Sequence, residues 1–237
     1  VPGSVLQITP YFINQNEGYI YVDNGSKKFF RTSDGGTSWT EIGSPNDIYI
    51  RQIYFTSFTH GYLAGDNGLY ETFNGGDTWK LISGILSNYT FFSVYVSGST
   101  ICATTAGVNI GYFNLVVSLD DGRSWKTIYS EIPDTTSAGT LLRYPYPYTT
   151  GNRDNLIVAF DPTSKLLYST DNGNMWASNP IDRRGVSVFC VPHCPDILYD
   201  KINFGLSFDD SSQIFHSSDF GRTWQQYSQL FTSRWIA

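Results

Sequence analysis

Carboxylates raise the first question about chemistry, because a glycoside hydrolase needs two of them about 5 to 10 Å apart around the scissile bond. Glutamate is scarce in this chain, and of the four glutamates only Glu131 falls in a segment that we expect to be an open loop. Aspartates are commoner in such segments, where they stand at Asp47, Asp66, Asp134, Asp182 and Asp209. Catalysis would require these carboxylates to converge on one pocket. A hydrolase therefore stays an alternative, and we assign no catalytic residue.

Nucleophilic and metal chemistry have weaker support. The three histidines form no persuasive arrangement with a serine and an aspartate, and they stand at His60, His193 and His216. The segment CVPHC brings Cys190, His193 and Cys194 together, but no fourth ligand for a zinc ion lies nearby in the sequence. We therefore expect neither a metal site nor a cofactor.

Cysteines and glycosylation sequons bear on the compartment. Cys190 and Cys194 flank a predicted turn and would form a local disulfide in an oxidising compartment. Cys102 lies within a predicted strand, where we expect it to act as a small buried apolar residue. Two sequons for N-glycosylation begin at Asn24 and Asn88, both in predicted turns. An extracellular, cell-surface or virion-surface location would suit these features.

A repeated eight-residue segment, here called the box, shows how such side chains would be positioned. A hydroxyl residue is followed two positions later by Asp or Asn and two further on by Gly, and Trp ends the segment. The five boxes span 32–39, 72–79, 118–125, 169–176 and 217–224. Their starts lie 40, 46, 51 and 48 residues apart, a spacing typical of β architectures built blade by blade.

Each residue type in the box has a physical reason. The Asp or Asn side chain accepts hydrogen bonds from backbone N–H groups and so fixes a tight turn. These residues are Asp34, Asn74, Asp120, Asp171 and Asp219. The glycine takes a positive φ without a Cβ clash. The tryptophan begins the next strand and places a large apolar side chain between layers. These residues are Trp39, Trp79, Trp125, Trp176 and Trp224.

With these five boxes the chain resembles the Asp-box, or bacterial neuraminidase repeat, family of β-propellers. That family includes sialidases, glucan-cleaving hydrolases, sortilin-type receptor ectodomains and a photosystem assembly factor, and the segment 60–79 (HGYLAGDNGLYETFNGGDTW) looks most similar to the last. The resemblance implies a propeller fold but no single activity, because its members include enzymes, receptors and assembly factors. A sialidase would carry an Arg-Ile-Pro type motif before the first box, and none stands before Thr32.

Alternation of apolar and polar residues between the boxes predicts an all-β chain. We expect a five-bladed β-propeller with four-stranded antiparallel blades and the box turn between strands three and four of each blade. The whole chain, 1–237, would be one domain, with blades at about 1–43, 44–84, 85–130, 131–180 and 181–230 and a tail at 231–237. Because each blade is contiguous, closure of the ring would rest on side-chain packing between the last blade and the first.

This topology puts the box turns at one end of the blades and the blade-to-blade links at the other. Ligands of propellers gather at the latter end, so its charged and aromatic loop residues are the binding candidates. They are Tyr49, Asp182, Arg183, Arg184, Asp209 and Asp210. Solvated loop charges are the competing interpretation. At the box end, the segment 144–148 (YPYPY) would either stack on a ligand or pack against its own blade.

Charge and composition exclude some partners. The net charge is −6 and the 15 basic residues are scattered, which argues against nucleic acid and anionic membrane. The sequence has no run of about 18 apolar residues, so we expect no transmembrane segment. We predict a non-catalytic surface module that binds a protein or carbohydrate ligand. A glycoside hydrolase and a rigid structural subunit of a larger assembly are the alternatives.

Overall fold

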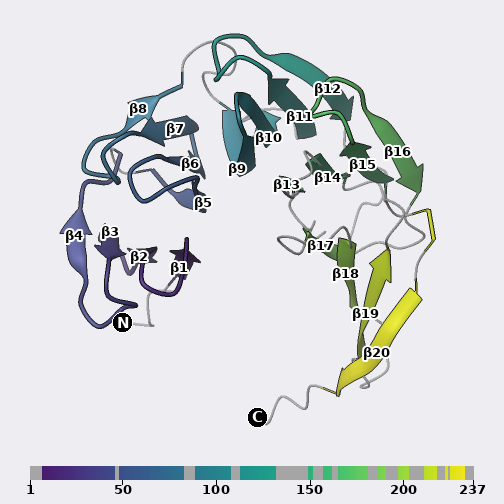
Figure 1. The fold of residues 1–237 in the computed structure, drawn as a ribbon, viewed down its shortest axis with the longest axis horizontal. Coiled ribbons are helices and arrows are strands. Elements are labelled where there is room, and N and C mark those ends of the chain that lie inside the picture. Colours follow the sequence, from purple (N-terminus) through teal and green to yellow (C-terminus); the bar gives the residue numbers. More distant parts are fainter. Residues whose placement is uncertain are drawn as a thin grey trace.

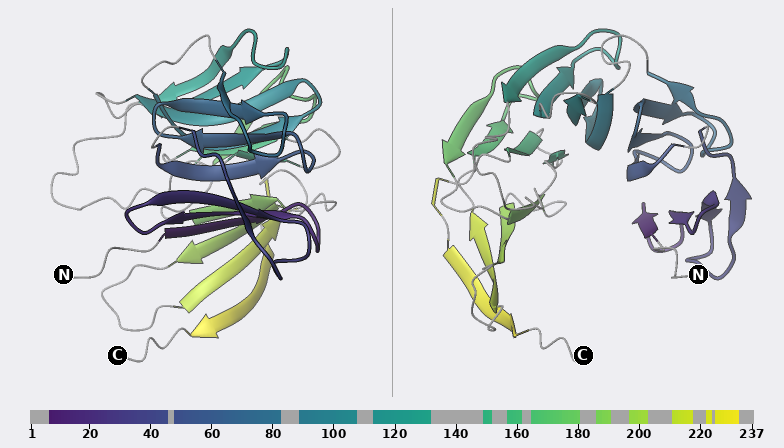
Figure 2. Two further views of the ribbon diagram at one scale, coloured as in Figure 1. Left: turned by 90° about the vertical axis from the view of Figure 1, so that its left-hand side faces the viewer. Right: turned by 180° about the vertical axis from the view of Figure 1, so that it is seen from behind.

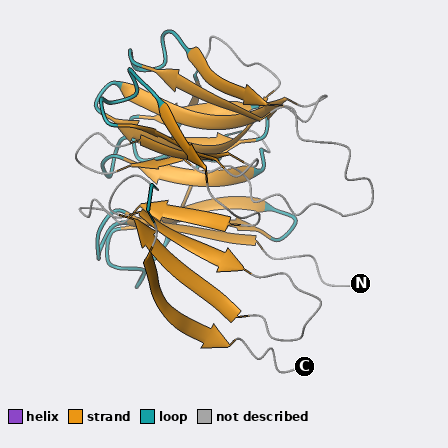
Figure 3. Cartoon of the chain, turned by 90° about the vertical axis from the view of Figure 1, so that its right-hand side faces the viewer, coloured by secondary structure: helices purple, strands orange, loops and turns teal. Residues whose placement is uncertain are grey.

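The computed structural model describes residues 7–45, 48–82, 89–107, 113–131, 149–151, 157–161, 165–180, 186–190, 197–202, 211–217, 222–223 and 225–232. Within these residues the chain forms strands and no helix (Figure 3). The strands pair antiparallel, in chain order, into five four-stranded sheets. The predicted all-β class and the four-stranded antiparallel sheets are thereby confirmed.

The first three sheets hold the following strands. The first comprises β1 (Gln7–Phe12), β2 (Gly18–Asp23), β3 (Lys27–Thr32) and β4 (Thr40–Ile42). The second comprises β5 (Ile50–Phe55), β6 (Gly61–Gly65), β7 (Gly68–Thr72) and β8 (Lys80–Leu81). The third comprises β9 (Tyr89–Ser97), β10 (Thr100–Gly107), β11 (Phe113–Ser118) and β12 (Lys126–Glu131).

The last two sheets complete the series. The fourth comprises β13 (Thr149–Gly151), β14 (Ile157–Asp161), β15 (Lys165–Ser169) and β16 (Ala177–Pro180). The fifth comprises β17 (Val186–Cys190), β18 (Ile197–Ile202), β19 (Ser211–Ser217) and β20 (Gln225–Thr232). The strand that pairs with β14 is β13.

The five sheets follow one another along an arc. In each sheet the first strand lies on the inner side of the arc and the fourth on the outer side (Figure 1). Seen from the side and from behind, the first and fifth sheets stand at the two ends of the arc (Figure 2). Within the described part of the chain, no strand of one end sheet pairs with a strand of the other.

Apolar side chains hold neighbouring sheets together. Between the first two sheets, Tyr19 and Phe29 are fully buried, and the Tyr19 ring stacks on Phe55 with ring centroids 3.7 Å apart. Phe55 also covers its pairing partner Gly61, where a Cβ atom would collide with the ring. A glycine is therefore required at this register position.

Alternation along the strands places the opposite face of the second sheet against the third sheet.

Candidate functional site

The four box turns that lie within the described residues share one set of contacts at one end of the sheets. In the first, the Thr32 hydroxyl donates to Asp34 Oδ1 at 2.8 Å and accepts from the Gly36 N–H at 2.9 Å. The same two bonds start from Thr72, Ser118 and Ser169 in the later turns. The predicted positive φ occurs at all four glycines, with 88° at Gly36. These turns use their polar atoms internally, which is a structural role.

Hydrogen bonds also fix the ionisation of the box carboxylates. The Ser38 hydroxyl and backbone N–H donate to Asp34, and they lower the pKa of that carboxyl to about 2. Ser124 does the same for Asp120, whose pKa is also about 2. Hydrogen bonds from the Met175 N–H and from Ser169 likewise lower the pKa of Asp171. The fifth pair, Asp219 and Trp224, lies outside the described residues.

The box tryptophans are less uniform than predicted. Each described tryptophan ends its box one residue before the next strand begins. Trp79, Trp125 and Trp176 are partly buried against the core. Trp39 is 36% exposed, which differs from the expected burial because, among the described residues, the first sheet has a neighbouring sheet on one side only. Trp79 also differs in donating its indole N–H to the Gly43 carbonyl, in the link between sheets, rather than to its own turn.

The opposite end of the sheets carries a cluster centred on Arg51. Its Nε donates to Asp66 Oδ1 at 2.9 Å. Its guanidinium carbon lies 5.2 Å from the centre of the Tyr49 ring and 4.8 Å from that of Phe92. A cation between two aromatic faces and a carboxylate is held in one orientation, because each contact restricts the flexible side chain. We call Tyr49, Arg51, Asp66 and Phe92 the arginine platform.

Two β-bulges produce this platform. In β5, Ile50 pairs with Gly65 and Gln52 pairs with Ala64, so Arg51 is the extra residue. In β9, Phe91 pairs with Thr105 and Ser93 with Thr104, so Phe92 is the extra residue. A bulge re-aims the side chain of its extra residue and is common beside functional sites. Here the two bulged residues belong to neighbouring sheets and contact each other.

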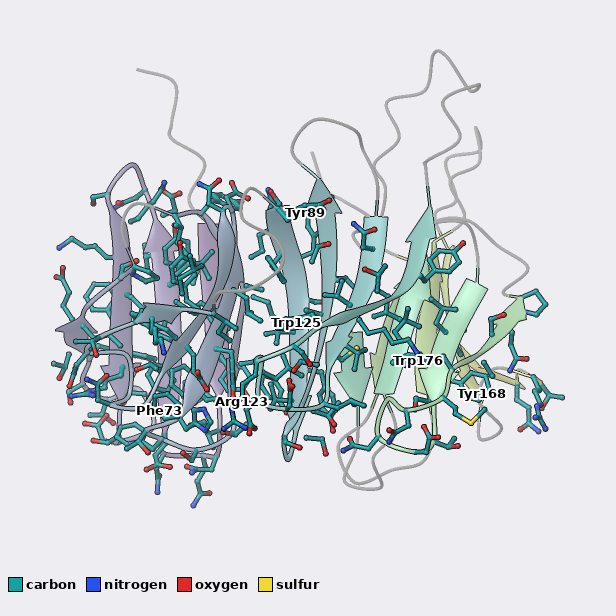
Figure 4. All side chains as sticks on the ribbon, turned by 90° about the horizontal axis from the view of Figure 1, so that it is seen from above. Phe73, Tyr89, Arg123, Trp125, Tyr168 and Trp176 are labelled. Carbon is teal, nitrogen blue, oxygen red and sulfur yellow. The ribbon has the colours of Figure 1, made fainter. Side chains whose placement is uncertain are left out.

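The turn between β6 and β7 completes the platform. The Asp66 N–H donates to the Tyr49 carbonyl at 3.1 Å, which ties the turn to the link that enters β5. Gly65 permits this approach, since a Cβ atom there would lie 2.7 Å from the Tyr49 carbonyl oxygen. β5 and β9 are inner strands, so the platform lies toward the inside of the arc (Figure 1). Figure 4 places Tyr89, which begins β9, at the end opposite Phe73 and Arg123 of the box turns.

The side chains of the platform differ in how far they are exposed to solvent. Phe92 is 7% exposed and Arg51 is 24% exposed at its side chain, whereas Tyr49 is 36% exposed. Tyr49 therefore presents a ring to solvent beside a fixed positive and a fixed negative group. Such a surface suits a flat or extended ligand with polar groups, because it offers stacking together with charge-assisted hydrogen bonds. The carboxylate of Asp66 contacts a cation here rather than a second carboxylate.

A second polar cluster lies at the box end. His60 Nε2 and Glu71 Oε1 are 2.9 Å apart, and the His60 ring stacks on the ring of Phe73 at 4.6 Å. The Glu71 carboxylate and burial together raise the pKa of Tyr62, burial being the larger cause. Within the described residues, no three His, Cys, Asp or Glu side chains gather as a metal site would need.

One of the six predicted binding residues lies within the described part of the chain. Tyr49 lies in the platform, and its role in binding stays a prediction. The other five candidates lie outside the described residues, and they are Asp182, Arg183, Arg184, Asp209 and Asp210. The sequence reasoning missed Arg51 and Phe92 because both look like ordinary strand residues. A strand start with an arginine between apolar residues, Ile50 and Ile53, is a weak signal that the alternation is broken.

Other predicted sites are similarly divided. Asn24 is exposed in the turn between β2 and β3, where its Oδ1 accepts from the Ser26 hydroxyl at 3.0 Å, while Asn88 lies outside the described residues. Cys190 ends β17 and Cys194 lies outside, so the disulfide stays a prediction. Cys102 is buried as expected, and burial raises the pKa of its thiol. No helix of the described residues is long and apolar enough to cross a membrane.

Comparison with known proteins shows the fold. No protein-family model matches the chain, and no curated protein does. Among solved structures, YCF48 bound to D1 peptide is 14% identical with a TM-score of 0.56, and the match covers 95% of this chain and 82% of that one. The GH74 enzyme of Niastella koreensis is 18% identical with a TM-score of 0.64. That match covers 90% of this chain but only 36% of the enzyme. At such identities the likeness shows a β-propeller fold and nothing further.

Proposed function

We propose that this chain is a non-catalytic, five-bladed Asp-box propeller that binds an extended ligand at the end opposite the box turns. The arginine platform carries this proposal, because two bulges in neighbouring sheets aim Arg51 and Phe92 at each other and leave Tyr49 exposed above them. A peptide is the ligand class that we favour. Its backbone and side chains offer the polar groups and flat surfaces that the platform can contact, and the similar propeller YCF48 was solved bound to a peptide.

The platform also weighs against hydrolysis at this point of the chain. Glycoside hydrolysis needs an acid and a base that face one another across the sugar. Asp66 instead faces Arg51 at 2.9 Å. The likeness to GH74 enzymes makes a hydrolase the alternative to test. A cell-surface, virion-surface or secreted setting belongs to the same proposal, and the exposed sequon at Asn24 suits it.

A selection experiment tests the proposal directly. The purified chain is panned against a random peptide phage library and, in parallel, against a glycan array, and a selected ligand is titrated by calorimetry. We expect Tyr49→Ala to weaken the affinity about 10- to 100-fold, the range of an interface anchor. Phe73→Ala, which truncates a more exposed aromatic ring at the box end, should leave it unchanged.

Arg51→Lys separates geometry from charge. Lysine keeps the positive charge but lacks the planar group and the Nε donor that Asp66 engages, so we expect affinity to fall as for Arg51→Ala. Unchanged binding by Tyr49→Ala and both Arg51 variants would contradict the proposal. Release of reducing sugar from xyloglucan or a sialoside by the wild type, lost in Asp66→Asn, would establish the hydrolase instead.

A further inference from the structure

Two side chains of β5 form hydrogen bonds with the backbone of β9, in the neighbouring sheet. Among the described strands β9 pairs with β10 alone, so buried backbone groups along its other edge need partners from outside the sheet. Gln52 Oε1 accepts from the Val94 N–H at 2.6 Å. The Tyr54 hydroxyl donates to the Val96 carbonyl at 3.1 Å. Val94 is fully buried and Val96 is 5% exposed, so losing either bond would leave a backbone group poorly placed to find water.

The tyrosine bond recurs between the first two sheets. Tyr11 precedes the last residue of β1, as Tyr54 precedes the last residue of β5, and the Tyr11 hydroxyl donates to the Phe55 carbonyl at 2.9 Å. Two residues earlier, β1 carries Thr9 where β5 carries Gln52. β1 pairs with β2 without a register shift, whereas β5 contains a bulge. The tyrosine therefore belongs to the common packing of the sheets, and the glutamine accompanies the bulge.

The glutamine bond lies beside both bulged residues of the arginine platform. Gln52 follows Arg51 directly, and Val94 stands two residues after Phe92. The two strands also meet through the platform itself, where the Arg51 guanidinium carbon lies 4.8 Å from the centre of the Phe92 ring. A bond of 2.6 Å next to this contact limits how far one strand can slide past the other. The placement of Phe92 against Arg51 therefore depends on the glutamine.

We propose that Gln52 is the positioning residue of the arginine platform: its bond to Val94 sets where the Phe92 ring lies against the Arg51 guanidinium. Without the bond, the strands must shift to give the buried Val94 N–H another partner. A cation–π contact extends only to about 6 Å from the ring centre, so a small shift ends it. The consequence for ligand affinity rests on the proposed function of the platform, whereas its geometry can be measured without a ligand.

Nuclear magnetic resonance of isotope-labelled protein tests the geometry. The signal of the Arg51 Nε–H is identified by its absence from Arg51→Lys. Ring currents of Tyr49 and Phe92 should shift this signal from its ordinary position. We expect Gln52→Leu to lose most of the shift, because the bond to Val94 is gone. Tyr54→Phe is the matched control, since it removes the neighbouring bond of the same strand, and it should keep the shift.

Gln52→Glu is the rescue variant, and it also replaces Gln52→Leu if that protein does not fold. A carboxylate still accepts from the Val94 N–H, so the Arg51 signal should stay at its wild-type position at neutral pH. Protonation of the introduced carboxyl weakens the acceptor, so the Val94 amide signal should move in an acid titration. Asp66 also faces Arg51, so the titration is followed at Val94 and compared with that of the wild type. A Val94 signal that moves equally in both proteins would overturn the proposal.

Ligand affinity completes the experiment. For a ligand selected at the platform, we expect Gln52→Leu to weaken binding about 10-fold, Gln52→Glu to restore it and Tyr54→Phe to leave it unchanged. An Arg51 signal that is unaffected by Gln52→Leu, or equally affected by Tyr54→Phe, would overturn the proposal. A shift lost in Gln52→Leu alone, in a protein for which no platform ligand is found, would support the positioning role while contradicting the proposed function.

Discussion

The two ends of the sheets are built on different rules. At the box end, four described turns repeat the same hydroxyl, carboxylate or amide, and glycine contacts almost atom for atom. At the opposite end, the arginine platform occurs once among the residues that the structure describes, between the second and third sheets. Repetition indicates a requirement that every sheet shares, namely a stable turn. A feature that occurs once has no such explanation, so it marks the end where we place binding.

The largest effect should be on the free energy of unfolding, when the packing between the first and second sheets is disrupted. Phe55→Ala removes a buried ring that contacts Tyr19 and Trp79, so we expect the free energy of unfolding to fall by about 3 to 5 kcal/mol. Phe73→Ala, which truncates a ring that is 66% exposed, should change it by less than about 0.5 kcal/mol. Urea unfolding followed by circular dichroism measures both. Equal losses in the two variants would show that the sheets do not pack as described.

A box hydroxyl should matter for stability and not for binding. Ser118 is buried, donates to Asp120 and accepts from the Gly122 N–H, so Ser118→Ala leaves a buried donor without its partner. We expect a loss of about 1 to 3 kcal/mol. Ser118→Thr keeps the hydroxyl, as Thr32 and Thr72 do in their own boxes, and should restore most of it. Reduced ligand affinity in a folded Ser118→Ala protein would contradict this prediction, because it would show that the box end also contributes to binding.

The arginine platform should matter for binding and little for stability. Its ion pair is partly exposed, at 24% for Arg51 and 38% for Asp66, so solvent screening limits its contribution. We expect Arg51→Ala to lower the free energy of unfolding by less than about 1 kcal/mol while ligand affinity falls at least tenfold. Thermal unfolding and calorimetric titration of one preparation decide this. A large loss of stability with unchanged affinity would make the platform a structural device.

The contrast between the ends also explains what the sequence could predict. The hydrogen bonds of the box hydroxyl and of the box carboxylate or amide are local, because they join residues at most four positions apart, such as Thr32 and Gly36. The spacing of five boxes therefore predicted turns, strands and sheets. The platform joins Tyr49, Arg51, Asp66 and Phe92 across two sheets. Its geometry depends on two bulges, each one residue long, and on how the sheets pack. Alternation patterns place residues on one face or the other and do not reveal an inserted residue.

The smallest effect concerns acid stability, and the box end offers its own control. Hydrogen bonds lower the pKa of Asp120 to about 2, below its ordinary value, so the folded protein holds this carboxylate ionised more readily than the unfolded chain. The stabilisation is complete above about pH 4, near the ordinary pKa of Asp, and is lost as the pH falls toward about 2. Asp120→Asn should therefore flatten the fall of the melting temperature in that range. The second box carries Asn74 at the equivalent position, where Asn74→Asp should steepen the fall if Thr78 donates to the new carboxylate as it does to the amide oxygen. Parallel acid profiles for these variants and the wild type would mean that the box hydrogen bonds do not distinguish the ionised carboxylate.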